Sequence, residues 1–222
     1  MRFLNKFFSG SPATARVAPF VIFLALTFCQ GKFGAASAYW FYFAKTLAGV
    51  WLIWKMRPFV AEMRWAISWE AVASGIGVFV IWVGLDPFYP KFLARGATGN
   101  PGDQFGENSP LTWFFIAVHI LGMTLVVPPL EEVFYRSFLY RYIAKPDFHS
   151  VPLNQFLPLP FLAAAAVFGL SHNEWLAGIL CGAAYQWLVL RKNRLGDAMT
   201  AHAITNLLLG VWIVWKHAWQ FW

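Results

Sequence analysis

Two adjacent glutamates and an arginine interrupt the apolar part of the chain, in the stretch PPLEEVFYRSF at residues 128–138. In a helix, Glu132 and Arg136 share a face, and the acid precedes the base, which is the favourable order for an ion pair. Glu131 points about 100° away and has no cationic partner in its own turn. A carboxylate left to find water or a histidine is what general-base chemistry requires.

Two prolines precede these glutamates and set the expected start of their helix. Proline is tolerated in a first helical turn and breaks what comes before it, so we expect the helix to begin after Pro128 and Pro129. Glu131 would then lie near the helix N-terminus, where the backbone dipole favours its negative form. The alternative is that both glutamates belong to one charge network that holds the helix against its neighbours.

Two further segments carry histidines at helical spacing. In FGLSH, Phe168 and His172 are four residues apart on a segment rich in alanine and glycine, which let helices approach closely in a membrane. Two polar residues follow His172 at once, which indicates that the helix ends in a polar pocket. In HAITN, His202 and Asn206 share a face, and both can donate hydrogen bonds to a developing oxyanion. The alternative for each motif is a hydrogen-bonded packing contact between helices.

The order of these three segments is more informative than any one of them. EEVFYR, FGLSH and HAITN match the motifs EExxxR, FxxxH and HxxxN. Together they resemble the CPBP family of intramembrane glutamic endopeptidases, which comprises CAAX-protease and bacteriocin-processing members. The resemblance covers about the last 110 residues. It departs from the family pattern at Ser137, where glycine is common.

The resemblance implies a role for each motif residue. Glu131 and His172 would activate water, and His202 and Asn206 would stabilise the tetrahedral intermediate. The supporting members of the first motif are Glu132 and Arg136. These roles suit peptide hydrolysis, which needs a base, a proton donor and oxyanion donors.

The resemblance also implies the reaction and its partners. We expect an endopeptidase that hydrolyses a peptide bond in a membrane-associated, prenylated or C-terminal-signal protein. No cofactor is implied. Zinc stays open, because Glu131, His172 and His202 are acceptable ligands in type and number.

Other intramembrane chemistries lack their motifs. There is no HExxH pair for a zincin, and Ser171 lacks the GxSxG surroundings of a nucleophile turn. Asp197 lies in LGD without the GxGD and YD of presenilin-like proteases, at a helix start where a capping role is expected. Two other classes remain open. One is a non-catalytic membrane immunity or scaffold protein, and the other is a transporter that uses carboxylates and histidines at depth.

The composition indicates the solvent that these side chains meet. Of 222 residues, 59% are hydrophobic and only 12% are charged, which is too apolar for a water-soluble domain. We therefore expect an all-α, polytopic membrane protein with about seven or eight transmembrane helices. The apolar stretches that predict them are 17–30, 34–54, 66–85, 111–130, 157–172, 174–190 and 196–215.

Charged and polar residues at membrane depth are costly, and each is a functional candidate. Those within or beside the predicted spans are Lys45, His119, Glu131, Glu132, Arg136, His172, Glu174, Asp197, His202 and Asn206.

The positive charges predict the orientation. Most of the 17 Lys and Arg fall on one side when the spans alternate from a cytoplasmic N-terminus. The net charge of +7 therefore reflects topology and contact with anionic lipid, and no nucleic-acid partner is expected. We expect a multi-pass protein of the bacterial inner membrane, with the first span kept as an anchor. The 2 cysteines predict no disulfide framework.

The chain is expected to form one integral membrane domain over residues 1–222. Residues 1–16 form a cytoplasmic arm, 110–215 carry the motifs, and the polar loop 86–110 is a connector or a lid. Glu131 is expected near the cytoplasmic boundary and His172 deeper. We therefore expect their site in a cavity that reaches down from the cytoplasmic face.

Overall fold

The fold was obtained as a computed structural model, which describes residue 8 and residues 10–92 and 99–222. These described residues form helices, turns and connecting segments without any strand, so the expected all-α class is confirmed. The first residues of the predicted N-terminal arm (1–7 and 9) lie outside the described residues, as does the centre of the predicted connector (93–98).

Long helical segments follow each of the predicted apolar stretches. They are α2 (Pro12–Thr27), α3 (Ser37–Met56), α4 (Trp69–Leu85), α6 (Pro110–Leu121), η3 (Gly122–Val126), α7 (Val127–Glu132), η4 (Val133–Leu139), α8 (Tyr140–Ala144), α9 (Pro158–Leu170), α10 (Trp175–Lys192) and α11 (Gly196–Lys216). Short helices in the connections are η1 (Arg57–Phe59), η2 (Asp86–Phe88), α5 (Pro101–Phe105), η5 (Phe148–Ser150) and η6 (Trp219–Phe221).

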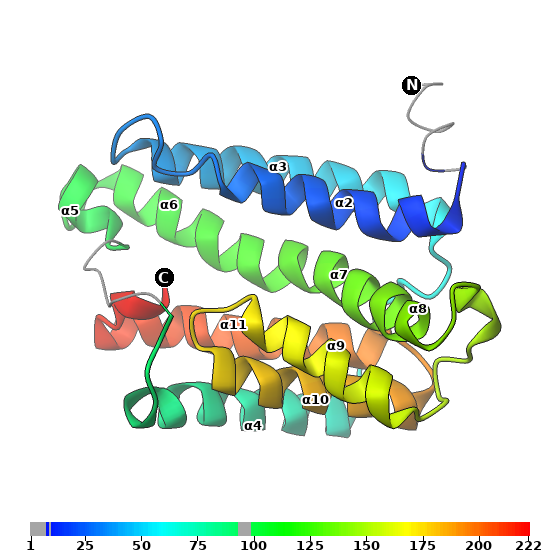
Figure 1. The fold of residues 1–222 in the computed structure, drawn as a ribbon. Coiled ribbons are helices and arrows are strands. Elements are labelled where there is room, and N and C mark those ends of the chain that lie inside the picture. Colours follow the sequence, from blue (N-terminus) through cyan, green and yellow to red (C-terminus); the bar gives the residue numbers. More distant parts are fainter. Residues whose placement is uncertain (1–7, 9, 93–98) are drawn as a thin grey trace.

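The helices run roughly side by side in three levels (Figure 1). The pair α2 and α3 lies on one side, and the long segment from α6 to α8 crosses the middle. On the other side lie α4, α9, α10 and α11, where α9 packs on α10 and α4 on α11. The middle segment carries the first motif, so it is placed to contact both outer groups.

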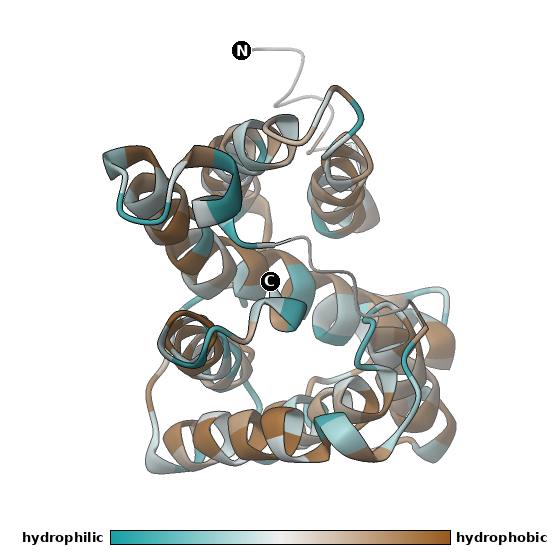
Figure 2. Cartoon of the chain, turned by 90° about the vertical axis from the view of Figure 1, so that its left-hand side faces the viewer, coloured by the Kyte–Doolittle hydropathy of each residue, from teal (hydrophilic) through white to brown (hydrophobic). Residues whose placement is uncertain are grey.

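The outer surface is apolar, as a bilayer requires. Hydrophobic residues cover most of the helical ribbons, outward-facing turns included (Figure 2). Exposed apolar side chains occur on helices of every level, among them Leu47, Val80, Leu125, Leu162 and Val211. Such a surface is expected where lipid replaces water, and the chain is a membrane protein.

Among the described residues, three helices are long and apolar enough to cross a membrane. They are Trp69–Phe88, Pro110–Ala144 and Gly196–Lys216. Shorter apolar helices are Pro12–Thr27 and Pro158–Leu170. The total of seven or eight spans stays a prediction.

The first helix begins earlier than the sequence suggests and shortens the predicted arm. Ser11 caps it, Pro12 fits its first turn, and both favour a helix start at this point. Arg16 is therefore helical and buried, and its Nη2 lies 2.7 Å from Oε1 of Glu62. Ser137 donates a hydrogen bond to the same carboxylate. Although burial acts to raise it, the pKa of Glu62 is lowered overall, because these two partners stabilise the charged form.

The prediction that a helix begins after the two prolines is wrong. The helix is continuous for 35 residues, over Pro110–Ala144, and Pro128 and Pro129 lie inside it. The turn before them, Gly122–Val126, is a π-helix. The wider turn makes room for the proline rings, which would otherwise clash with the carbonyls of the preceding turn. Glu131 therefore lies within a helix and gains no N-terminal dipole.

Glycines allow α9 and α10 to touch closely. A Cβ added at Gly169 would lie 2.4 Å from the backbone nitrogen of Ile179, and one added at Gly178 would lie 2.8 Å from the Cα of Gly169. Both distances are shorter than any ordinary carbon contact. The turn that follows α9, which carries His172, is thus fixed against α10 by backbone contact.

Two smaller expectations also differ from the structure. The predicted connector 86–110 contains the short helix α5, which is capped by Asn100. Asp197 is not an N-cap, because it lies inside the first turn of α11. It instead accepts a hydrogen bond from Ser68 and pairs with Arg194.

Candidate functional site

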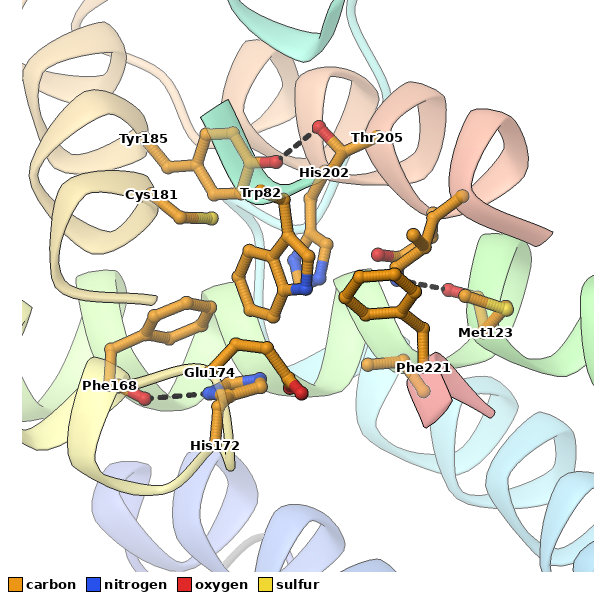
Figure 3. Close-up of a pocket in the computed structure, with 13 residues that line it drawn as sticks. Trp82, Met123, Phe168, His172, Glu174, Cys181, Tyr185, His202, Thr205 and Phe221 are labelled. Atoms are coloured by element: carbon orange, nitrogen blue, oxygen red, sulfur yellow. Dashed lines mark hydrogen bonds between the residues drawn. The ribbon is translucent and has the colours of Figure 1, made fainter. Parts of the chain in front are cut away.

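Three of the polar motif residues meet at a pocket between α4, the middle helix, α10 and α11. The cavity measures about 190 Å³. His172, His202 and Asn206 all line it, although they come from two motifs that are 30 residues apart. Figure 3 shows the two imidazoles pointing into the same space, with Trp82 and Phe221 beside them. The remaining lining residues are Met123, Val127, Phe168, Glu174, Cys181, Tyr185, Thr205 and Leu209.

His172 is held by the end of its own helix. The predicted helical stretch 157–172 includes His172, but α9 stops at Leu170, so His172 lies in the turn that follows. Its Nδ1 donates a hydrogen bond to the carbonyl of Phe168 at 2.8 Å, which Figure 3 shows as a dashed line. With the proton on Nδ1, the neutral ring keeps Nε2 as a free acceptor. The edge of Trp82 faces this ring at 5.5 Å between centroids, so the acceptor stands in a largely apolar wall.

His202 is oriented by the buried charges of the first motif. Its Nδ1 lies 2.9 Å from Oε1 of Glu132. The other oxygen of Glu132 is 3.0 Å from Nε of Arg136, a close ionic contact that is too bent for a hydrogen bond. Arg136 also donates to the carbonyl of Gly182 at 3.3 Å. The predicted ion pair is therefore present, but Glu132 serves His202 as well, which spacing along one helix did not reveal.

Asn206 is fixed by a backbone carbonyl that a proline leaves free. Its Nδ2 donates to the carbonyl of Met123 at 2.6 Å. In the π-turn, the N–H of Val127 bonds to the carbonyl of Gly122. The next nitrogen belongs to Pro128, which has no hydrogen to offer Met123. The freed carbonyl thus holds the carboxamide against the pocket, and one N–H of Asn206 remains for a ligand.

Glu131 stands at the border of this arrangement. Among the described residues it is not part of the pocket lining, and its Oε2 is buried without a hydrogen-bond partner. It shares a helical face with Tyr135, whose hydroxyl donates to Ser171 at 3.2 Å, next to His172. Its charge also acts on Lys45. The structure thus brings His172, His202 and Asn206 together. Glu131 lies outside this group, one helical turn before Tyr135.

Three pocket residues had no predicted role. Glu174 follows the second motif directly and faces the histidines, and burial raises its pKa. The hydroxyl of Tyr185 donates to Thr205 at 2.6 Å, which braces α10 against α11 within the pocket wall. Thr205 lies inside the third motif, three residues after His202, so helical spacing could have indicated it. No comparable signal marks Tyr185.

The pocket extends from the α9–α10 turn into the middle of the bundle. His172 and Glu174 line it at the turn, whereas Tyr185 lies well inside α10 and Asn206 well inside α11. In Figure 1 that turn and the C-terminus lie together at the left, whereas α8 lies at the right. Because α9 has 13 residues, His172 lies at its C-terminal end, in the turn that leads to α10. The expectation that the cavity opens to the cytoplasmic face stays a prediction.

The described residues contain no group of three His, Cys, Asp or Glu side chains placed to hold a metal ion. The candidate zinc ligands Glu131, His172 and His202 do not all line one pocket, because Glu131 is absent from the lining of the pocket that holds the two histidines. No step below involves a metal.

Comparison with known proteins finds a family that is similar to the part of the chain that holds these motifs. Residues 112–208 match the family described as "Type II CAAX prenyl endopeptidase Rce1-like". No curated protein and no solved structure matches the chain. The matched range includes all three motifs and excludes α2, α3, α4 and the C-terminal segment.

Proposed function

We propose that this membrane protein, whose residues 112–208 match the Rce1-like family of CAAX endopeptidases, hydrolyses a peptide bond within the bilayer. The family match confirms the resemblance drawn from the three motifs, and it indicates a protease. The substrate, the catalytic groups and the orientation in a bacterial inner membrane belong to the proposal. The observation that carries it is the convergence of His172, His202 and Asn206 on one enclosed pocket.

The first step is activation of water. His172 presents an unprotonated Nε2 to the pocket, because its Nδ1 proton is held by the Phe168 carbonyl. Glu131 is the second base of the pair, and water bridges it to the ring. Proton removal from water lets the oxygen attack the scissile carbonyl, and the acquired proton then passes to the leaving amine.

The second step is stabilisation of the oxyanion. Asn206 offers its remaining N–H from a fixed position, because the Met123 carbonyl holds the amide. His202 offers Nε2–H when its ring is doubly protonated, and Glu132 at Nδ1 then balances that charge. Fixed donors of this kind act strongly in a water-poor site because they need no reorganisation.

The proposed peptidase function is tested by variants of the proposed catalytic residues in a strain that carries the protein. Comparative proteomics of membrane and secreted fractions would identify one protein whose terminus shifts when Glu131→Gln replaces wild type. We expect His172→Ala to give the same loss. We expect Asn206→Ala to leave residual cleavage, about 100–1,000-fold below wild type, the usual cost of one oxyanion donor.

The same experiment separates the other function classes. A wild-type phenotype in the Glu131→Gln strain, with no shifted terminus, would support a non-catalytic immunity or scaffold protein. Solute flux into proteoliposomes without any cleavage product would support a transporter. Near wild-type cleavage by purified Glu131→Gln would refute the role proposed for this glutamate.

A further inference from the structure

A second cavity, which we call the lysine cavity, adjoins the histidine pocket and has no place in the reaction described above. Its volume is about 370 Å³. Phe221 lines the histidine pocket, and the next residue, Trp222, lines the lysine cavity, so the two spaces share a wall. The remaining lining residues are Gln30, Ala38, Tyr39, Tyr42, Lys45 and His119.

Lys45 is the charged group of this cavity, and among the described residues no carboxylate contacts it directly, although the charge of Glu131 acts on it. Its side chain is only 7% exposed. Its Nζ donates to Oγ1 of Thr27 at 3.1 Å and more weakly to Oε1 of Gln30 at 3.5 Å. An ammonium has three donors, so one remains. Within the described part of the chain, no carboxylate lies within ion-pair distance of it. A buried cation with no carboxylate in direct contact is costly in a membrane, and such residues mark functional sites.

Aromatic rings surround the ammonium and shape the cavity. The rings of Tyr42 and Phe23 lie 4.7 and 4.9 Å from Nζ. The imidazole of His119 stacks between Tyr42 and Trp222, with centroids 4.1 and 3.9 Å away. A flat wall of rings beside one free cationic donor fits a small planar anion that is attached to an apolar group.

One continuous helix links the lysine cavity to a group that positions Asn206. His119 lies one helical turn before Met123, whose carbonyl holds Asn206. An extended peptide advances about 3.3–3.6 Å per residue. Because consecutive residues line the two cavities, a peptide of a few extended residues has the length to reach from one to the other.

We propose that Lys45 binds a carboxylate of the peptide that occupies the histidine pocket, either its terminal carboxylate or an acidic side chain. This inference rests on the proposed peptidase function and adds a substrate requirement to it. The phosphate of an anionic lipid is the other anion available in a membrane. The shared wall favours the peptide, because it places the lysine beside the pocket where the peptide backbone would lie.

The test uses peptide binding, which is independent of cleavage. The full chain in nanodiscs of neutral lipid would be titrated with an apolar tripeptide in three forms: the free acid, the C-terminal amide, and an amide that carries one aspartate. We expect wild type to bind at least one acidic form about 10-fold or more tightly than the neutral amide, because a charge-assisted hydrogen bond supplies that ratio. Whichever acidic form is preferred identifies the source of the carboxylate.

Variants assign the preference to the lysine. Lys45→Met should bind all three peptides equally, and Lys45→Arg should retain the preference. Lys55→Met is the matched control, because Lys55 lies on the same helix and contacts Trp54 instead of the cavity. We expect it to behave as wild type.

Several results would overturn the inference. Equal affinity of wild type for acid and amide would do so directly, as would a preference that survives in Lys45→Met. Competition by phosphatidylglycerol that depends on Lys45 would assign the cavity to a lipid phosphate. A chain that cleaves peptides without preferring acids refutes only this inference, whereas one that prefers acids but cleaves nothing refutes the peptidase proposal.

Discussion

Replacing Glu132 by glutamine tests the buried charge arrangement that orients His202. The substitution keeps the size of the side chain and an oxygen that can accept from Nδ1 of His202. It removes the only negative charge that contacts Arg136 within the described structure. Glu132 and Arg136 are 0% and 1% exposed, so water cannot replace the lost partner.

The magnitude follows from this burial. Breaking a buried ion pair on one side costs about 3–5 kcal/mol, because the remaining charge stays uncompensated. In a chain of this length, 1 kcal/mol corresponds to about 2–4 °C in the melting temperature. We therefore expect Glu132→Gln to lower the apparent melting temperature in detergent by roughly 6 to 20 °C. Glu70→Gln, which breaks the more exposed pair with Lys192, is the matched control and should change it little.

A double-mutant cycle identifies the cause. Arg136→Met alone leaves Glu132 buried without a cation, and should also destabilise strongly. The double variant Glu132→Gln with Arg136→Met removes both charges, so its cost should be smaller than the sum of the single costs by about 0.5–3 kcal/mol. Melting followed by intrinsic fluorescence measures all four proteins. Simple additivity would refute the coupling inferred from the structure.

Three further outcomes are expected from melting experiments. Glu62 has a lowered pKa, so the stability that it adds through Arg16 is present above the usual carboxyl range and is lost as the pH falls through the folded pKa. The melting temperature of wild type should therefore exceed that of Glu62→Gln near neutral pH, and this difference should disappear in acid. Glu174 has a raised pKa, so wild type should match Glu174→Gln in acid and become the less stable protein as the pH rises through that value. Gly169→Ala should destabilise by about 1–3 kcal/mol, because its Cβ would collide with the backbone of α10. Gly84→Ala, where nothing lies within 4 Å, should be neutral or slightly stabilising, and equal effects of the two glycine variants would contradict the close packing.

Much of the fold could be predicted because a bilayer constrains helices simply. Apolar stretches of about 20 residues indicate spans, and each predicted stretch became a helix. The polar residues after His172 indicated that a helix ends close to it, and α9 ends two residues before it. The ion pair of Glu132 and Arg136 followed from helical spacing alone. These are local properties of one helix.

The other features of the site depend on contacts with neighbouring helices or on backbone hydrogen bonds, which residue spacing does not show. Pro128 was expected to break the helix, but a π-turn one step earlier accommodates it. Helical spacing indicates Arg136 as a partner of Glu132, but it does not identify His202, because that contact crosses 70 residues of sequence. Whether Glu131 and His172 share a water molecule stays a prediction.

The shortness of α9 has a consequence for the surrounding lipid. Its 13 residues rise about 20 Å, whereas the hydrocarbon layer is about 30 Å thick. A mismatch of this size is relieved by local thinning of the bilayer or by sinking one helix end below the headgroups. Either response brings the aqueous phase closer to the α9–α10 turn. The proposed hydrolysis within the bilayer needs such access, since water is its second substrate.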